Sequence, residues 1–254
     1  MSRLDHCEYR LGFSGTLDGK QCNELQLTGL FGPIRRSIST KELIDRGTLA
    51  QLKIKMIVLR HEPHVREQMK FCEYREEMEY IIGCERRNRF IRNLALSLEG
   101  NTLILFQFVE AHGKLIYEAI RDSVKEGRKV FFVHGKVPGE DRDAIRSIVE
   151  KETNAVIVAS RGTFSTGINI VQINSLIFAS PLKAQISNLQ SIGRGLRKSD
   201  TKTECVVYDI VDDLSTPPSW RNHTLKHAEV RQTIYINEGF PYRTYRVSLG
   251  SELL

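Results

Sequence analysis

Apolar segments of strand length alternate with amphipathic segments of helix length from residue 102 to residue 211. Apolar runs predict strands over residues 102–109, 129–133, 154–159, 175–179 and 204–211. Helical spacing of apolar residues predicts the intervening helices over residues 112–126, 139–152 and 184–196. Continuous apolar strands are typical of a sheet that is covered on both faces. The alternation therefore predicts a parallel, right-handed α/β sheet.

The segments that precede this unit have a less regular pattern. Residues 10–19 predict a short strand that ends in a hydroxyl-rich turn, and residues 52–59 predict a further strand. Residues 73–98 predict one or two charged amphipathic helices with a break near Gly83.

A boundary is expected after Asp213, where Thr216-Pro217-Pro218 interrupts the pattern. Beyond it the sequence predicts a helix through Arg231, a loop at residues 239–241 and an alternating segment over residues 242–249. We therefore expect three parts: residues 1–45, with too few elements for a domain of their own, then 46–214, and an extension over 215–254.

The composition of the 254 residues is ordinary for a globular protein, with 41% hydrophobic and 27% charged residues. No apolar run reaches the roughly 18 residues of a membrane span, and the first residues lack the apolar core of a signal peptide. The net charge of +6 favours an anionic partner. The five cysteines lack metal-site spacing and are odd in number, which favours a reducing cytosol over a disulfide framework.

Polar and basic residues follow several of the predicted strands. They are His134-Gly135-Lys136, the stretch from Ser160 and Arg161 to Asn169, and a helix with Gln190, Arg194 and Arg197. Ligands of open parallel sheets gather at the carboxyl ends of the strands. Backbone N–H groups, hydroxyls and guanidinium groups at that edge favour phosphate binding.

Each of these features also has a purely structural interpretation. His134 can be an ordinary loop histidine, the Ser/Thr/Gly stretch simple turn chemistry, and Arg194 and Arg197 a solvated helix end. The chain has no G-x-x-x-x-G-K-[ST] phosphate loop, and its one Asp-Asp pair, Asp212-Asp213, favours a structural role over Mg²⁺ binding. The sequence alone therefore offers half of an ATPase site.

Four motifs together resemble the C-terminal half of the superfamily-two helicases, over nearly the whole chain. They are Ser14-Gly15-Thr16 (motif III), Leu105-Phe106-Gln107 (motif IV), Ser160 with Ser165 to Asn169 (motif V), and Gln190-x-x-Gly193-Arg194-x-x-Arg197 (motif VI). More narrowly, residues 10–19, 29–32 and 208–213 resemble the recombination and branch-migration helicases of T-even phages.

The resemblance implies a RecA-like second motor lobe, preceded by a remnant of the first lobe and followed by a small C-terminal extension. It implies that Gly167 and Asn169 contact the nucleotide and that Arg194 and Arg197 reach the γ-phosphate. The resemblance to motif VI also implies that Gln190 is a catalytic residue. The coupling motif is Ser14, Gly15 and Thr16, and the residues facing DNA are His134, Gly135, Lys136, Ser160 and Arg161.

The family's motifs I and II are absent from these 254 residues, so we expect ATP and Mg²⁺ to require a first lobe, in cis or in trans. A truncated gene, a split gene or a fragment would each explain the absence of these motifs.

The expected partners are single-stranded and branched DNA, with RNA–DNA hybrids as a further option, in the bacterial host cytoplasm if the chain is phage-encoded. A non-catalytic nucleic-acid-binding module remains the alternative; an unrelated doubly wound nucleotide-binding protein lacks its G-x-G-x-x-G fingerprint here.

Overall fold

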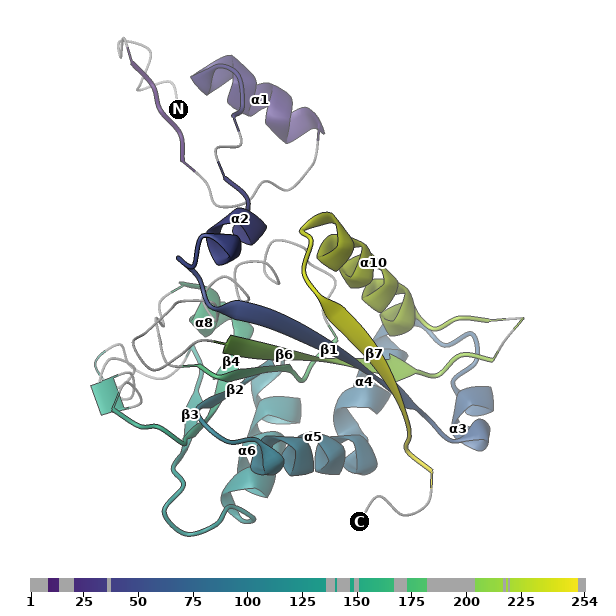
Figure 1. Ribbon diagram of the computed structural model, residues 1–254. Coiled ribbons are helices and arrows are strands. Elements are labelled where there is room, and N and C mark those ends of the chain that lie inside the picture. Colours follow the sequence, from purple (N-terminus) through teal and green to yellow (C-terminus); the bar gives the residue numbers. More distant parts are fainter. Residues whose placement is uncertain are drawn as a thin grey trace.

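A seven-stranded parallel sheet forms the centre of the molecule, in the order β3-β4-β2-β5-β6-β1-β7 (Figure 1). The structure is a computed structural model that describes residues 9–13, 21–35, 38–135, 140, 147–148, 151–166, 173–181, 204–216, 218 and 220–250. The strands are β1 Gln51–Arg60, β2 Thr102–Phe106, β3 Val130–Val133, β4 Val156–Ser160, β5 Ser175–Phe178, β6 Glu204–Asp213 and β7 Tyr242–Ser248. The expected parallel α/β sheet is confirmed.

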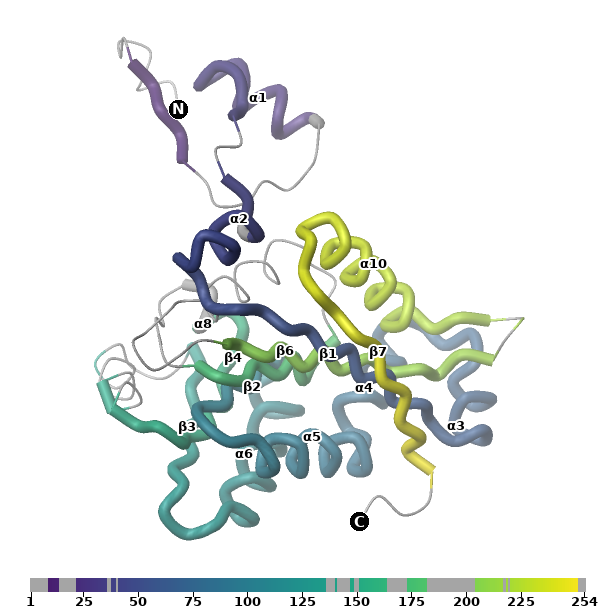
Figure 2. Tube along the Cα trace, viewed as in Figure 1, coloured from purple at the N-terminus to yellow at the C-terminus, as the bar shows by residue number. Residues whose placement is uncertain are grey.

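Helices cover both faces of this sheet (Figure 2). The helices of the described residues are α1 Gln21–Phe31, which lies apart from the sheet (Figure 1), α2 Thr40–Asp45, α3 Pro63–Gln68, α4 Tyr74–Gly83, α5 Glu85–Ser97, α6 Lys114–Arg121, α8 Arg161–Thr166 and α10 His223–Asn237, with a π-helix, η2, at Val109–Gly113. Apolar residues of α5 and α6 pack on one face, and those of α2 and α10 pack on the other. Burial of these two apolar layers is the main stabilising contribution to the fold.

Strands that are far apart in the sequence lie side by side in this sheet. Strand β1 pairs with β6 over ten residues, from Gln51 opposite Glu204 to Arg60 opposite Asp213. Strand β7, which lies in the segment expected to form a C-terminal extension, pairs with the other side of β1 and is the edge of the sheet. Residues 242–248 therefore extend the central sheet.

The break between α4 and α5 falls at Cys84, beside the expected position at Gly83. The expectation of a strand to residue 109 was wrong, because β2 ends at Phe106 and the chain turns into η2. The helix expected over 112–126 was also misplaced, since α6 ends at Arg121. Close approach of Gly113 to the buried Phe106 ring allows this early turn.

The polar stretch after β4 is helical at its start, where we expected a turn. Helix α8 occupies Arg161–Thr166, and the hydroxyl groups of Ser160 and Thr163 are hydrogen-bonded at 2.7 Å. This contact links the last residue of β4 to the first turn of α8.

We predict that Gly113→Ala destabilises the protein by about 1–3 kcal/mol, because the added Cβ lies 2.4 Å from the Phe106 ring in a close-packed core. Gly83→Ala is the matched control, since no atom lies within 4 Å of its Cβ position, and we expect a change within about 1 kcal/mol. Urea unfolding monitored by circular dichroism measures both values. Equal stability of the two variants would contradict the close contact.

Candidate functional site

The carboxyl ends of the strands carry the candidate residues that the structure describes, namely His134, Gly135, Ser160 and Arg161. The other candidates lie outside the described residues: Ser14, Gly15, Thr16, Lys136, Gly167, Asn169, Gln190, Arg194 and Arg197. The geometry of the site is therefore built from the first group and from the residues that hold it in place.

The ends of β3 and β4 lie together. Gly135, just after β3, is exposed, and a Cβ at this position would lie 3.8 Å from the Thr163 hydroxyl of α8. Ser160 is 8% exposed and its hydroxyl is bonded to Thr163, so its side chain is engaged at the start of α8. His134 is half-buried and its ring packs against Phe132. At this part of the edge the exposed Gly135 is accessible to a ligand, whereas the Ser160 hydroxyl is buried.

Arg161 introduces positive charge at the same edge. Its guanidinium is partly buried, and this burial, together with the nearby Arg231, lowers the pKa of Arg161. Arg231 is itself paired, with Nε and Nη2 donating to the two oxygens of Asp209, each at 2.8 Å. Within the described part of the chain no carboxylate forms an ion pair with Arg161. Since a guanidinium stays protonated at neutral pH, Arg161 is suited to bind an anion.

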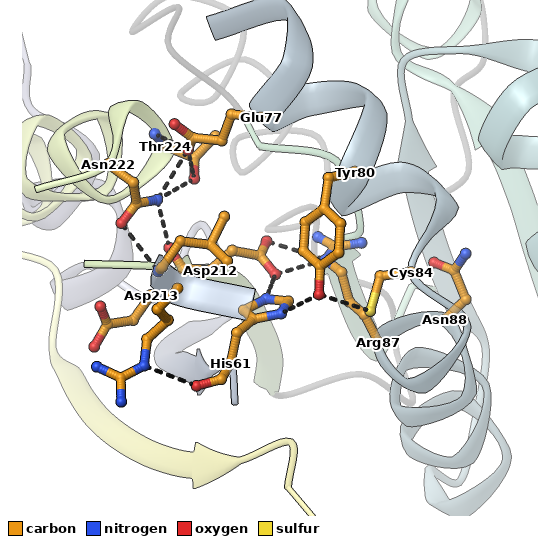
Figure 3. Close-up of polar contacts among 12 residues, drawn as sticks. His61, Glu77, Tyr80, Cys84, Arg87, Asn88, Asp212, Asp213, Asn222 and Thr224 are labelled. Atoms are coloured by element: carbon orange, nitrogen blue, oxygen red, sulfur yellow. Dashed lines mark hydrogen bonds and ion pairs between the residues drawn. The ribbon is translucent and has the colours of Figure 1, made fainter. Parts of the chain in front are cut away.

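A buried ion pair between Arg87 of α5 and Asp212 of β6 lies beneath this edge (Figure 3). Arg87 Nε donates to both carboxylate oxygens, at 2.9 and 3.0 Å, and Nη2 donates to the Ala179 carbonyl at 2.6 Å. His61, at the end of β1, lies 3.0 Å from the same carboxylate. The three side chains thus connect the ends of β1, β5 and β6.

The charges of this cluster follow from its contacts. Burial alone would raise the pKa of Asp212, but Arg87 and His61 outweigh it and lower the value to about 2. Burial alone would lower the pKa of His61, but its hydrogen bonds to Asp212 and Cys84 raise the value to about 9. Asp212 is therefore ionised and His61 is cationic at neutral pH.

The cluster extends to Gln107 at the end of β2, a residue of the stretch that resembles motif IV. Arg87 Nη1 lies 3.4 Å from His112 Nε2, and His112 Nδ1 lies 2.9 Å from the Ser180 hydroxyl. The Gln107 backbone N–H donates to that hydroxyl at 3.0 Å. Burial and Arg87 lower the pKa of His112 to about 3, so this ring is neutral. The Ser180 hydroxyl is therefore hydrogen-bonded to the residue that follows β2. In the sequence, Ser180 precedes the segment that contains Gln190.

A second buried carboxylate anchors the C-terminal helix. Glu77 of α4 accepts hydrogen bonds from the backbone N–H groups of His223 and Thr224, at 2.8 and 2.7 Å, and from the Asn222 side chain at 2.9 Å (Figure 3). Backbone N–H groups at a helix start lack partners within the helix, and the helix dipole favours an anion there. Glu77 therefore fixes the start of α10 against α4.

The sequence analysis did not predict the buried contacts of Asp212 with Arg87 and His61, or the contact of Glu77 with the start of α10. A signal was present for Arg87, which occupies the apolar stripe of its helix four residues before Ile91, where a charged residue requires a buried partner. The structure gives Asp212 a structural role, as expected for the Asp212-Asp213 pair. In the described residues no group of three His, Cys, Asp or Glu residues could hold a metal ion.

Residues 85–199 match the family of the helicase conserved C-terminal domain. The chain carries a helicase C-terminal domain. It is 34% identical to the ATP-dependent DNA helicase UvsW of Enterobacteria phage T4, over 98% of this chain and 51% of that protein. The chain thus spans about half the length of this curated relative.

The RecA-like architecture expected for this helicase domain is confirmed by similarity to solved structures. The crystal structure of T4 UvsW matches with a TM-score of 0.68 and 32% identity, over 89% of this chain and 45% of that one. The ATP-dependent type ISP restriction-modification enzyme LlaBIII, bound to DNA, matches with a TM-score of 0.61 and 14% identity, over 89% and 17%. The second likeness shows a shared fold only.

No helix in the described residues is long and apolar enough to cross a membrane.

We predict that Asp212→Asn destabilises the helicase domain by about 3–5 kcal/mol, because it leaves the Arg87 guanidinium buried without a counter-charge. The control is Glu204→Gln, which removes the exposed partner of Lys53 and is expected to change stability by about 1 kcal/mol or less. Urea unfolding of both variants tests this difference. An Asp212→Asn protein as stable as the control would mean that the buried pair does not hold the strand ends.

Proposed function

We propose that this chain is the second motor lobe of an ATP-dependent DNA helicase that acts in recombination, at replication forks or on other branched DNA. The observation that carries the proposal is its 34% identity to the DNA helicase UvsW along 98% of its own length. The arrangement of the carboxyl edge supports it, since Gln107, Ser160 and Arg161 follow or end neighbouring strands there, and Gln107 is hydrogen-bonded to Ser180 of the buried polar cluster.

In this proposal the nucleotide binds between two lobes. By the family resemblance, Gly167 and Asn169 contact ATP, and Arg194 and Arg197, together with Gln190, act on its γ-phosphate. The sequence has no phosphate loop, and the described residues offer no metal-binding group, so ATP and Mg²⁺ would need a first lobe supplied in cis or in trans. An arginine pair is suited to this task, because its planar donors can neutralise charge that develops on the transferred phosphoryl group.

Nucleic acid would lie across the carboxyl edge, against His134, Gly135, Lys136, Ser160 and Arg161. No carboxylate of the described residues forms an ion pair with Arg161, and exposed Gly135 permits a close approach of the backbone. Phosphate contacts of this kind give affinity without sequence preference. Single-stranded and branched DNA are the proposed substrates, with RNA–DNA hybrids as a further option, in the host cytoplasm as for a phage enzyme.

A second function is a non-catalytic nucleic-acid-binding or regulatory module derived from a helicase. Such a module would use the exposed Gly135 and the charge of Arg161 at the carboxyl edge without ATP hydrolysis. The two functions share the DNA-binding edge and differ in whether a first lobe restores ATP hydrolysis.

We predict that the chain binds single-stranded DNA weakly and that the affinity falls about tenfold or more between about 50 and 200 mM salt, because phosphate contacts release counterions. Arg161→Ala should weaken binding and reduce the log–log salt slope by about 0.7. Fluorescence anisotropy with a labelled oligonucleotide measures both quantities. The control is Arg121→Ala at the far end of α6, where the side chain is paired with Asp122. A salt-independent affinity would be incompatible with this interface.

We predict that the chain alone hydrolyses no ATP and that a first lobe, added in trans or fused, restores DNA-stimulated hydrolysis. Arg197→Ala should then reduce turnover by about 10³-fold or more while DNA affinity is retained, because an arginine finger acts on the transition state. Arg197→Lys should fail similarly, since an ammonium lacks the planar fork.

The matched control is Lys198→Ala, which removes the adjacent positive charge and should leave turnover within about twofold. Steady-state ATPase assays with and without DNA compare the three variants. Turnover by the chain alone would refute the two-lobe site, and an active Arg197→Ala protein would refute the role of Arg197.

A further inference from the structure

Two loops at the carboxyl edge present aromatic side chains to each other. One joins α3 to α4 and carries Phe71, and the other follows β6 and carries Trp220, with ring centroids 6.3 Å apart in an edge-to-face arrangement. Three residues after Phe71, Tyr74 forms a second aromatic group, with its ring 6.0 Å from His223 and 5.4 Å from His227. We refer to these five residues as the aromatic patch.

The two loops are held together by hydrogen bonds beneath the patch. Arg66 of α3 donates to the His61 carbonyl at 3.0 Å and to the Ser215 carbonyl at 3.1 Å. Trp220 pairs with Thr216 through two backbone hydrogen bonds of 3.0 and 3.1 Å. The ends of β1 and β6, from which both loops extend, lie side by side in the sheet (Figure 1). The patch is therefore a fixed surface.

Phe71 is held in a conformation that its own packing does not explain. Its φ is 61°, the single positive value among the described non-glycine residues, and its side chain is 69% exposed. A bulky residue in this region is strained, and such strain concentrates at ligand-binding positions. The Lys70 ammonium lies 5.5 Å from the centre of the Phe71 ring, which places positive charge beside it.

The patch adjoins the Arg161 charge described above. Tyr74 packs against His223 and His227 of α10, and Arg231 follows His227 by one turn of that helix and lies near Arg161, which comes directly after β4 at the same edge. Two of the carboxylates nearby have hydrogen-bond partners in the described residues: Glu76 accepts from the Glu73 backbone N–H at 2.9 Å, and Glu77 binds the start of α10. Glu67 pairs with Lys70 at 3.8 Å. The surface therefore combines aromatic faces with a cation that lacks a carboxylate partner in the described residues.

We propose that the aromatic patch is a stacking platform for the unpaired bases of a single nucleic-acid strand whose phosphates contact Arg161. Every base has a π-face, so stacking on Phe71, Trp220 and Tyr74 gives affinity without sequence preference. The platform lies outside the helicase motifs and deepens the proposed function, on which it rests for the class of ligand. A protein segment docked on the same rings would need neither Arg161 nor the bases.

Trp220 is the only tryptophan of the chain, so its emission reports on this surface alone. We would titrate the protein with a thymidine oligonucleotide and with an abasic oligonucleotide of equal length, which keeps the phosphates and lacks the bases. The thymidine strand is expected to quench Trp220 and to bind more tightly, whereas the abasic strand binds weakly without quenching. Equal binding of the two strands with unchanged emission would overturn the platform and leave the proposed DNA-binding edge intact. Binding of neither strand would refute both.

Phe71→Gly is the decisive variant, because glycine adopts a φ of 61° without strain and the loop can keep its conformation. Its affinity for the thymidine strand should fall about fivefold to a hundredfold, with the abasic strand unaffected. Phe71→Tyr should retain affinity. Tyr245→Ala on β7, which removes another exposed ring that is 42% accessible, should behave as wild type.

Wild-type affinity of Phe71→Gly for the thymidine strand would overturn the inference. A change in Trp220 emission with protein concentration, in the absence of any oligonucleotide, would instead identify the patch as an interface between copies of the chain and would also overturn it.

Discussion

The buried ion pair between Arg87 and Asp212 is the interaction on which the carboxyl edge depends. Two charges in an apolar interior are tolerated only where geometry and further hydrogen bonds compensate for lost hydration. Arg87 meets this condition by donating to both Asp212 oxygens and to the Ala179 carbonyl, and His61 supplies a further contact. Because these groups come from α5, β6, β5 and the end of β1, the pair fixes several strand ends relative to one another.

Two further buried polar clusters attach the C-terminal segment to the sheet. Asp209 accepts two hydrogen bonds from Arg231 and one from Tyr235, all within the core, while Glu77 binds the start of α10. Apolar burial alone would allow α10 to slide, since it has no direction. Directional bonds at its start and along its length define one position. With α10 in place, β7 can pair with β1 and extend the sheet.

The sequence was sufficient to predict what local periodicity determines. The seven strands of the sheet and the break between α4 and α5 follow from runs of apolar residues and their spacing. The strand expected from residue 10 does not form over residues 10–13, and residues 14–19 lie outside the described residues. The end of β2 and the π-helix could not be predicted, because they depend on the contact between Gly113 and the Phe106 ring. The Arg87–Asp212 pair joins residues 125 positions apart, and nothing in either local pattern identifies the partner. Of the candidate site, Ser160, Arg161, His134 and Gly135 lie at the expected edge.

Arg87 and Arg161 show how the same side chain serves stability or binding according to its partners. Arg87 is fully buried and every contact compensates its charge, so it makes the strand ends rigid. Arg161 is partly buried and lies near a second guanidinium that is already paired, and no carboxylate of the described residues forms an ion pair with it. Because the Arg87–Asp212 cluster holds strand ends at the edge where Arg161 also lies, a ligand of this edge would meet strand ends that are already in position. Phe71, held at a positive φ beside the same edge, extends this principle from charge to an aromatic face.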